Sequence, residues 1–211
     1  MSRGIFIAFE GGEGAGKSTQ ALLLADALAQ RGVDCIVTRE PGGTPGAEAI
    51  RALLLGTGGE GWNPRAEALL FAAARSDHVE RLIQPALAAG KWVICDRFVD
   101  SSRAYQGGGS GLTDAQVLDL HRVGSQGLLP DLTLLVEVSP DVARQRAAAR
   151  DLGGADRIGG RDESYHAKVA LAFAAIAAAE PARFARIDGN GPAASVHSAV
   201  LAALKPLFGA L

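Results

Sequence analysis

A glycine-rich stretch near the start of the chain has the residue types needed to bind phosphate groups. It follows the pattern G-x-x-x-x-G-K-[ST] and runs Gly11, Gly12, Glu13, Gly14, Ala15, Gly16, Lys17, Ser18 and Thr19. Glycines let the backbone wrap a phosphate with its N–H groups pointing inward, and a following helix N-terminus adds partial positive charge. In this pattern the lysine reaches the β- and γ-phosphates, and the serine hydroxyl contacts Mg²⁺. The spacing therefore predicts a nucleoside triphosphate site.

A pair of charged residues, Asp96 and Arg97, directly follows the apolar run 92–95. A carboxylate at the end of a strand beside the phosphate loop can hold Mg²⁺ directly or through water. The planar guanidinium of Arg97 suits a second phosphate group. Alternatively, the two residues form a structural ion pair.

Aromatic and polar residues elsewhere could contact a base. Phe71 and Arg75 are four residues apart, so on a helix they share a face and could stack a base and hydrogen-bond its edge. A core phenylalanine beneath a surface arginine is the simpler interpretation of that spacing. Tyr105 and Gln106 precede the glycine run 107–109. We expect this segment to be a flexible loop, with or without a role in a site.

Arginines crowd one later region of the chain, at Arg144, Arg146, Arg150, Arg157 and Arg161. On a helix, Arg146 and Arg150 are i,i+4 neighbours, which repel unless an anion or solvent screens them. The glycine-rich segment 151–161 is bracketed by arginines, which a plain loop does not require. These residues are either a solvated basic face or a phosphate clamp on a mobile flap.

Strand-like and helix-like segments alternate along the chain. Short apolar runs predict strands over 4–10, 33–38, 92–95, 132–138 and 185–187. Helical spacing predicts helices over 17–31, 45–55, 64–89 with a bend near Pro85, 113–127 with Thr113 as its N-cap, 140–150, 163–179 and 193–207. This alternation indicates an α/β fold with a mostly parallel five-stranded sheet covered on both faces. Such sheets bind ligands at the carboxyl ends of their strands, where the charged residues above are expected to meet.

The composition limits the possible classes of protein. With 211 residues, the chain is the size of one domain. Its 21 basic and 23 acidic residues argue against a polybasic nucleic-acid binder. No apolar run approaches the ~20 residues of a membrane span, and the N-terminus is too short for a signal peptide. We therefore expect a soluble cytoplasmic protein, with Cys35 and Cys95 as buried free thiols.

Five segments together resemble the thymidylate kinases of the bacterial type, in the family order and nearly from end to end. They are FEGGEGAGKSTQ, TREPGGT, LLFAAAR, DRFVDSSRAYQGGG and PDLTLLVEV, the last leading into the arginine-rich flap. The resemblance implies a P-loop nucleoside monophosphate kinase fold, with a single domain over 1–211 and a mobile lid over about 150–162. It also implies a homodimer that uses Mg²⁺ and moves the γ-phosphoryl group of ATP, bound by the phosphate loop, onto dTMP.

By matching position, the resemblance implies roles for individual residues. Phe71 stacks the thymine, Arg75 bonds its edge, and Tyr105 packs on the sugar. The full set of implied dTMP contacts is Glu13, Arg51, Phe71, Arg75, Asp96, Arg97, Ser102, Tyr105 and Gln106. Ser18 and Asp96 serve the metal. The implied catalytic residues are Lys17, Arg97, Arg150 and Arg157.

One branch of this family carries an arginine inside the phosphate loop, where this chain has Gly14. The branch that lacks it supplies an arginine from the flap, and Arg150 and Arg157 stand at matching places. The flap is slightly longer here than the family pattern, around residues 153–155. The choice between the two flap arginines therefore stays open.

Two other functions are compatible with a phosphate loop. The chain could be a small kinase for another nucleoside monophosphate or for a metabolite. It could instead be a nucleotide-driven switch or assembly ATPase, although it has no Asn-Lys-x-Asp string of the kind that guanine-binding switches use. A degenerate binding module is disfavoured because both Lys17 and Asp96 are present.

Overall fold

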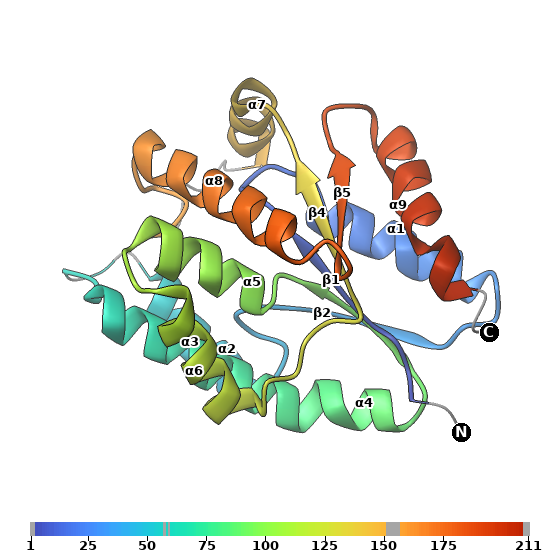
Figure 1. The fold of residues 1–211 in the computed structure, drawn as a ribbon, viewed down its shortest axis with the longest axis horizontal. Coiled ribbons are helices and arrows are strands. Elements are labelled where there is room, and N and C mark those ends of the chain that lie inside the picture. The colour runs from blue at the N-terminus through green and yellow to red at the C-terminus, as the bar shows by residue number, and fades with distance from the viewer. Residues whose placement is uncertain (1–2, 57, 59, 151–156, 209–211) are drawn as a thin grey trace.

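The computed structural model describes residues 3–56, 58, 60–150 and 157–208. Five parallel strands form one sheet in the order β2-β3-β1-β4-β5. Figure 1 shows this sheet in the middle of the molecule with helices around it. The strands are β1 (Phe6–Glu10), β2 (Cys35–Arg39), β3 (Trp92–Asp96), β4 (Leu132–Glu137) and β5 (Phe184–Asp188). The predicted five-stranded parallel sheet is therefore confirmed, with boundaries shifted by one to two residues.

Helices connect the strands. They are α1 (Lys17–Ala29), α2 (Pro45–Leu55), α3 (Pro64–His78), α4 (Gln84–Ala88), α5 (Val99–Ser102), α6 (Asp114–Ser125), α7 (Pro140–Arg150), α8 (Glu163–Ala179) and α9 (Ala193–Phe208). Side-chain caps begin several of them, among them α2, α3, α6 and α8. Thr44 and Asn63 accept backbone N–H groups at the starts of α2 and α3, each followed by proline at the first helical position. Thr113 forms a reciprocal capping box with Gln116, which confirms its predicted capping role.

The predicted long helix over 64–89 is divided into three parts. Between α3 and α4 lies a π-helical segment, η1 (Val79–Ile83), just before Pro85. Because proline has no N–H to donate, the regular hydrogen-bond pattern is interrupted at this position.

The prediction of a flexible loop over the glycine run was wrong. Residues Arg103–Gly109 continue α5 as a second π-helical segment, η2. The reason is packing against α8. A Cβ atom at Gly108 would lie 2.4 Å from the Cβ of Ala172, and one at Gly109 would lie 2.5 Å from the Tyr165 ring. The role of these glycines is therefore to let η2 and α8 pack closely, and not to make the chain flexible.

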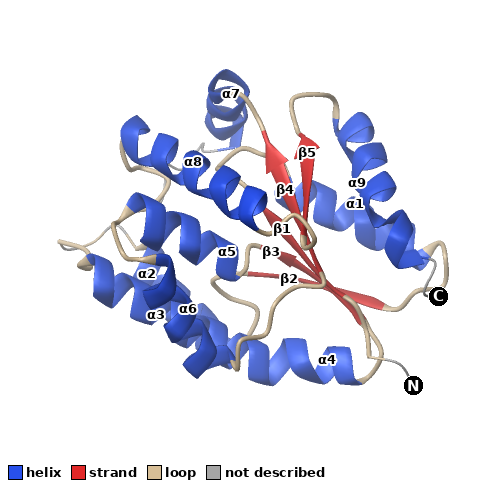
Figure 2. Cartoon of the chain, in the orientation of Figure 1, coloured by secondary structure: helices blue, strands red, loops and turns tan. Residues whose placement is uncertain are grey.

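Alternate residues of the central strands face two different cores, as the pleat of a strand requires. On one face, Phe9 and Ile94 pack with residues of α1 and α9, while on the other Phe6 and Val93 pack with η1 and α4. Figure 2 shows helices on both sides of the sheet. The predicted covering of both faces is confirmed.

Two further expectations concern the membrane and the cysteines. Within the described residues, no helix has both the length and the apolar character needed to cross a membrane. Both cysteines are free thiols; Cys95 is buried as predicted, but Cys35 is only half-buried.

Candidate active site

A cavity of about 420 Å³ opens where the carboxyl ends of β1, β2 and β3 meet. Lys17 and Ser18 line it on the phosphate-loop side. Of the expected dTMP contacts, eight also line it: Glu13, Arg51, Phe71, Asp96, Arg97, Ser102, Tyr105 and Gln106. The topology thus gathers side chains that are far apart in the sequence, at the edge where parallel sheets bind ligands.

The phosphate loop joins β1 directly to α1. Its geometry needs glycine, since Gly11 and Gly14 have φ angles of 134° and 68°, and added Cβ atoms would lie 2.2 Å and 2.6 Å from backbone oxygens. The Lys17 ammonium donates to the carbonyls of Gly11 (3.1 Å) and Gly12 (2.7 Å). Burial, together with the nearby Arg97 charge, lowers the pKa of Lys17 to about 8. The two hydrogen bonds hold the lysine side chain against the phosphate loop.

Arg97 lies close to that lysine, since both side chains donate to the Gly11 carbonyl. Its guanidinium donates to the Gly11 carbonyl (3.0 Å) and the Ser101 hydroxyl (3.2 Å), and forms an ion pair with Glu13. It also lies over the Tyr105 ring, 5.0 Å from the centroid. The Arg97 backbone is left-handed, with φ 71°, a conformation that costs a non-glycine residue about 1–3 kcal/mol. The surrounding fold imposes this conformation and so aims the side chain into the cavity.

Ser18 and Asp96 lie side by side at the base of the cavity, where the Ser18 hydroxyl donates to the Asp96 carboxylate. Hydroxyl and carboxylate oxygens are the ligands that Mg²⁺ prefers in proteins, with the remaining positions taken by phosphate and water. This pair of oxygens fits the expected metal.

Arg75 is more deeply buried than its neighbour Phe71. Only 3% of its side chain is exposed; Nε donates to Glu40 at 2.7 Å, and a terminal nitrogen donates to the Ser102 hydroxyl at 2.9 Å. Phe71 is half-buried and lines the cavity. The simpler interpretation, a core phenylalanine beneath a surface arginine, was therefore wrong. Arg75 lies directly behind Ser102, which does line the cavity.

The Glu40 carboxylate connects several buried side chains on this side of the cavity. Besides Arg75, it contacts His78 at 3.1 Å, and His78 also contacts the Thr38 hydroxyl at 2.7 Å. Burial alone would raise the pKa of Glu40, but Arg75 and His78 outweigh it and hold the pKa below its usual value. The carboxylate is thus a fixed negative charge between strand β2 and helix α3.

Residues 9–200 match the thymidylate kinase family. The chain belongs to this family. It is 54% identical over 205 residues to the thymidylate kinase of Rhizorhabdus wittichii, an alignment that covers 97% of this chain and 99% of the relative. It is 48% identical over 200 residues to that of Caulobacter vibrioides, covering 95% of each. The crystal structure of the Ehrlichia chaffeensis thymidylate kinase is also similar, with 33% identity, a TM-score of 0.79 and coverage of 96% of this chain and 100% of that one.

In this chain, the described arginines of the later region do not share one solvent-exposed face. Arg146 reaches toward the carbonyl of Ala15 in the phosphate loop (3.5 Å) and bonds that of Gly191 (3.2 Å). Arg144 pairs with Asp141 and Glu163 on the surface. A single solvated basic face therefore does not describe this region.

The two catalytic arginines expected from the lid, Arg150 and Arg157, are described by the structure to different extents. The side chain of Arg150 lies outside the described residues, as does 151–156 of the expected lid. Arg157 donates to the carbonyls of Gly56 (2.7 Å) and Gly58 (2.6 Å), which follow α2. Two residues close to it, Ile158 and Gly159, line the cavity.

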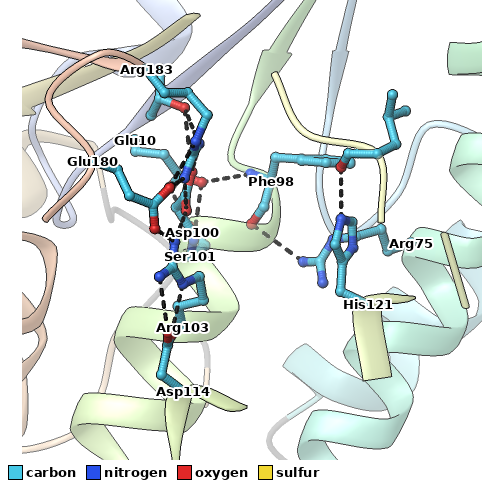
Figure 3. Close-up of polar contacts among 12 residues, drawn as sticks. Glu10, Arg75, Phe98, Asp100, Ser101, Arg103, Asp114, His121, Glu180 and Arg183 are labelled. Carbon is cyan, nitrogen blue, oxygen red and sulfur yellow. Dashed lines mark hydrogen bonds and ion pairs between the residues drawn. The ribbon is translucent and has the colours of Figure 1, made fainter. Parts of the chain in front are cut away.

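Sequence reasoning missed Glu10, which is fully buried at the end of β1. It accepts the backbone N–H groups of Phe98 (2.8 Å) and Ser101 (3.0 Å) and the Ser101 hydroxyl (2.6 Å), so it anchors the turn that carries Arg97 (Figure 3). Burial, followed by the charge of Asp100, raises the pKa of Glu10 to about 7. Its only signal in the sequence is an acidic residue at the end of an apolar strand.

A network of ion pairs also supports the turn that carries Arg97. Asp100 accepts from Arg103 (3.1 Å) and from Arg183 (2.7 and 2.9 Å), and Glu180 bonds both arginines (Figure 3). Because Arg183 precedes β5 and Arg103 begins η2, these contacts tie the helical segment after Arg97 to the edge of the sheet.

Proposed function

We propose that this member of the thymidylate kinase family transfers the γ-phosphoryl group of ATP to dTMP, giving dTDP and ADP in the supply of dTTP for DNA replication. The observation that carries the proposal is one cavity lined by both the phosphate-loop Lys17 and the acceptor-side residues Arg97 and Phe71. A nucleotide-driven switch or an assembly ATPase would not need the acceptor-side residues Arg97 and Phe71.

Phosphoryl transfer between two nucleotides depends mainly on positioning and on charge stabilisation. In the proposed complex, the loop Gly11–Thr19 binds the ATP phosphates, and Lys17 contacts the group in transfer. Arg97 and Arg51 bind the dTMP phosphate, which already carries negative charge, so no strong general base is required. The Arg51 guanidinium also donates to the Pro41 carbonyl at 2.7 Å, which fixes it at the cavity wall.

The remaining contacts define the nucleoside. Phe71 stacks the thymine, with Arg75, Ser102 and Gln106 on the base side. Tyr105 packs on the sugar, where a 2′-hydroxyl group would clash with it, and Glu13 faces the 3′-hydroxyl group.

Mg²⁺ is expected to bind with the nucleotide. Ser18 and Asp96 would hold it, on the strength of their adjacent oxygen atoms. When bound, the ion neutralises phosphate charge.

An arginine from the lid is proposed to complete the site. Since Gly14 supplies no cation to the loop, Arg150 or Arg157 is assigned to the charge on the transferring group. Closure of the lid over both nucleotides would also exclude water and suppress hydrolysis of ATP. The family resemblance further supports a homodimer and a cytoplasmic location.

Measurement of ADP release with each possible acceptor tests the proposed function. The purified chain is given Mg²⁺-ATP with dTMP, dUMP, dCMP, AMP or GMP, or with no acceptor. We expect the largest kcat/KM for dTMP and almost no release without an acceptor. A preference for another monophosphate would indicate a different kinase. Steady release insensitive to every monophosphate would indicate an ATPase.

A further inference from the structure

Glu67 is a buried carboxylate that the proposed function does not use. It lies on α3 one turn before Phe71 and two turns before Arg75, so the three residues share the helix face that forms the base side of the cavity. Only 2% of Glu67 is exposed. A carboxylate is rarely buried to this extent without specific partners.

Each oxygen of Glu67 has its own partner. Oε1 accepts from Nε2 of Gln106 at 2.9 Å, within the buried interior. Oε2 accepts from a terminal nitrogen of Arg161, which forms an ion pair with Glu67. These partners are 39 and 94 residues away in the sequence.

These contacts fix the orientation of the Gln106 amide. An ionised carboxylate can only accept hydrogen bonds, so Gln106 must turn its NH₂ group toward Glu67. The carbonyl Oε1 of Gln106 then points away from Glu67, and Gln106 lines the cavity. We infer that Glu67 is a positioning residue for base selection, which makes Gln106 present an acceptor, and not a donor, to the base.

An acceptor at this position distinguishes pyrimidine bases. Thymine and uracil carry an N–H donor at ring position 3, whereas cytosine has an acceptor there. Two facing acceptors leave both groups unsatisfied in a buried site, which weakens the binding of cytosine relative to thymine and uracil. The inference rests on the proposed function and adds to it that Glu67 selects dTMP and dUMP over dCMP, without reading the thymine methyl group.

Arg161 forms the ion pair that holds the Glu67 carboxylate in place. Its guanidinium lies 4.5 Å from the centre of the Tyr165 ring and donates to the Tyr165 hydroxyl, which in turn donates to the backbone carbonyl of Tyr105 at 3.0 Å. One arginine thus neutralises Glu67 and braces the segment that carries Gln106. Arg161 is therefore not available as the phosphate clamp considered for this group of arginines.

The test compares kcat/KM for dTMP, dUMP and dCMP in the full chain and in Glu67→Gln. A neutral amide at position 67 can either donate or accept, so the Gln106 amide is free to reverse. We expect the dTMP/dCMP ratio to fall at least about tenfold, equivalent to about 1.4 kcal/mol, with the dTMP/dUMP ratio and the KM for ATP unchanged. Glu180→Gln is the matched control, because it also removes a carboxylate from an arginine pair but lies outside the cavity; both ratios should stay at wild-type values.

A merely structural role for Glu67 would lower all three activities together and leave both ratios unchanged, which would overturn the inference. If Glu67→Gln does not fold, the double variant Glu67→Met/Arg161→Met removes both charges and leaves no buried charge without a partner. It must show the same fall in the dTMP/dCMP ratio, and an unchanged ratio overturns the inference. A wild-type chain that does not phosphorylate dTMP would contradict the proposed function instead.

Discussion

The two sides of the cavity are built in different ways. The phosphate loop is one continuous stretch, and Lys17 bonds carbonyl groups only five and six residues away. The base side depends on buried ion pairs between distant residues, such as Arg75 with Glu40 and Arg161 with Glu67. Loss of the Lys17 side chain breaks only bonds to backbone carbonyl groups, whereas loss of Arg75 or Arg161 leaves a buried carboxylate without its arginine. The two sides should therefore respond differently to substitution.

Lys17→Ala should give the largest loss of activity with little loss of stability. The transferring phosphoryl group loses its main cation, while the Gly11 carbonyl keeps its hydrogen bond from Arg97. We expect folded protein with nearly all turnover lost, measured by ADP release and thermal melting. Retention of more than about a tenth of wild-type turnover, a loss under ~1.4 kcal/mol, would show that Lys17 is not the phosphate-loop cation.

Arg150→Ala should lower single-turnover transfer at least about 100-fold, some 2.7 kcal/mol, with a much smaller change in dTMP affinity. Arg157→Ala is the comparison, because Arg157 already bonds backbone carbonyl groups beside α2. Arg144→Ala is the control, since its partners Asp141 and Glu163 lie on the surface.

Two patterns of result would change this assignment. Fast transfer in Arg150→Ala with none in Arg157→Ala would move the catalytic role to Arg157. Wild-type rates in all three variants would remove the lid arginines from the mechanism.

Arg75→Ala should lower both activity and stability. Its loss leaves the Glu40 carboxylate buried without its arginine, a change that typically costs about 3–5 kcal/mol in unfolding free energy. We expect kcat/KM for dTMP to fall about tenfold or more, while the KM for ATP stays nearly constant. Arg75→Lys, which keeps a charge, should recover part of the stability. Equal losses for ATP and dTMP would assign Arg75 a purely structural role.

Tyr105→Phe should have the smallest effect. The hydroxyl of Tyr105 is 3.4 Å from the nearer Glu13 oxygen, a long hydrogen bond, while the ring keeps its contact with Arg97. We expect a change in kcat/KM for dTMP below about fivefold, under ~1 kcal/mol. A loss as large as that of Arg75→Ala would mean that the hydroxyl group contacts the substrate directly.

The contrast between contacts that are local in the chain and contacts between distant residues also explains which features the sequence could predict. The phosphate loop, the Asp96–Arg97 pair and the Thr113 cap depend on residues that are close in the chain, so their spacing was informative. The five strands were recognisable because each is a short apolar run between turn residues. In contrast, Glu10, Glu40 and Glu67 are single acidic residues whose buried partners are contributed by other elements, and no local pattern identifies such partners.

The segment with the glycine run 107–109 was misjudged for a related reason. Three consecutive glycines favour a loop by local propensity, and only the packing of Gly108 and Gly109 against α8 makes this segment helical. Helical spacing did place Phe71 and Arg75 on one face, and one further turn along the same face reaches Glu67. This shared helix face was therefore the sequence feature that could have indicated a role for Glu67.

The central claim is that the γ-phosphoryl group passes from ATP on the phosphate loop directly to dTMP in the same cavity. The most direct measurement is a rapid-quench single turnover with excess enzyme, Mg²⁺, ATP labelled in the γ-phosphate, and dTMP. The account predicts that the label appears in dTDP as ATP disappears, with almost none as inorganic phosphate. Label released as phosphate, at a rate that dTMP does not change, would contradict it.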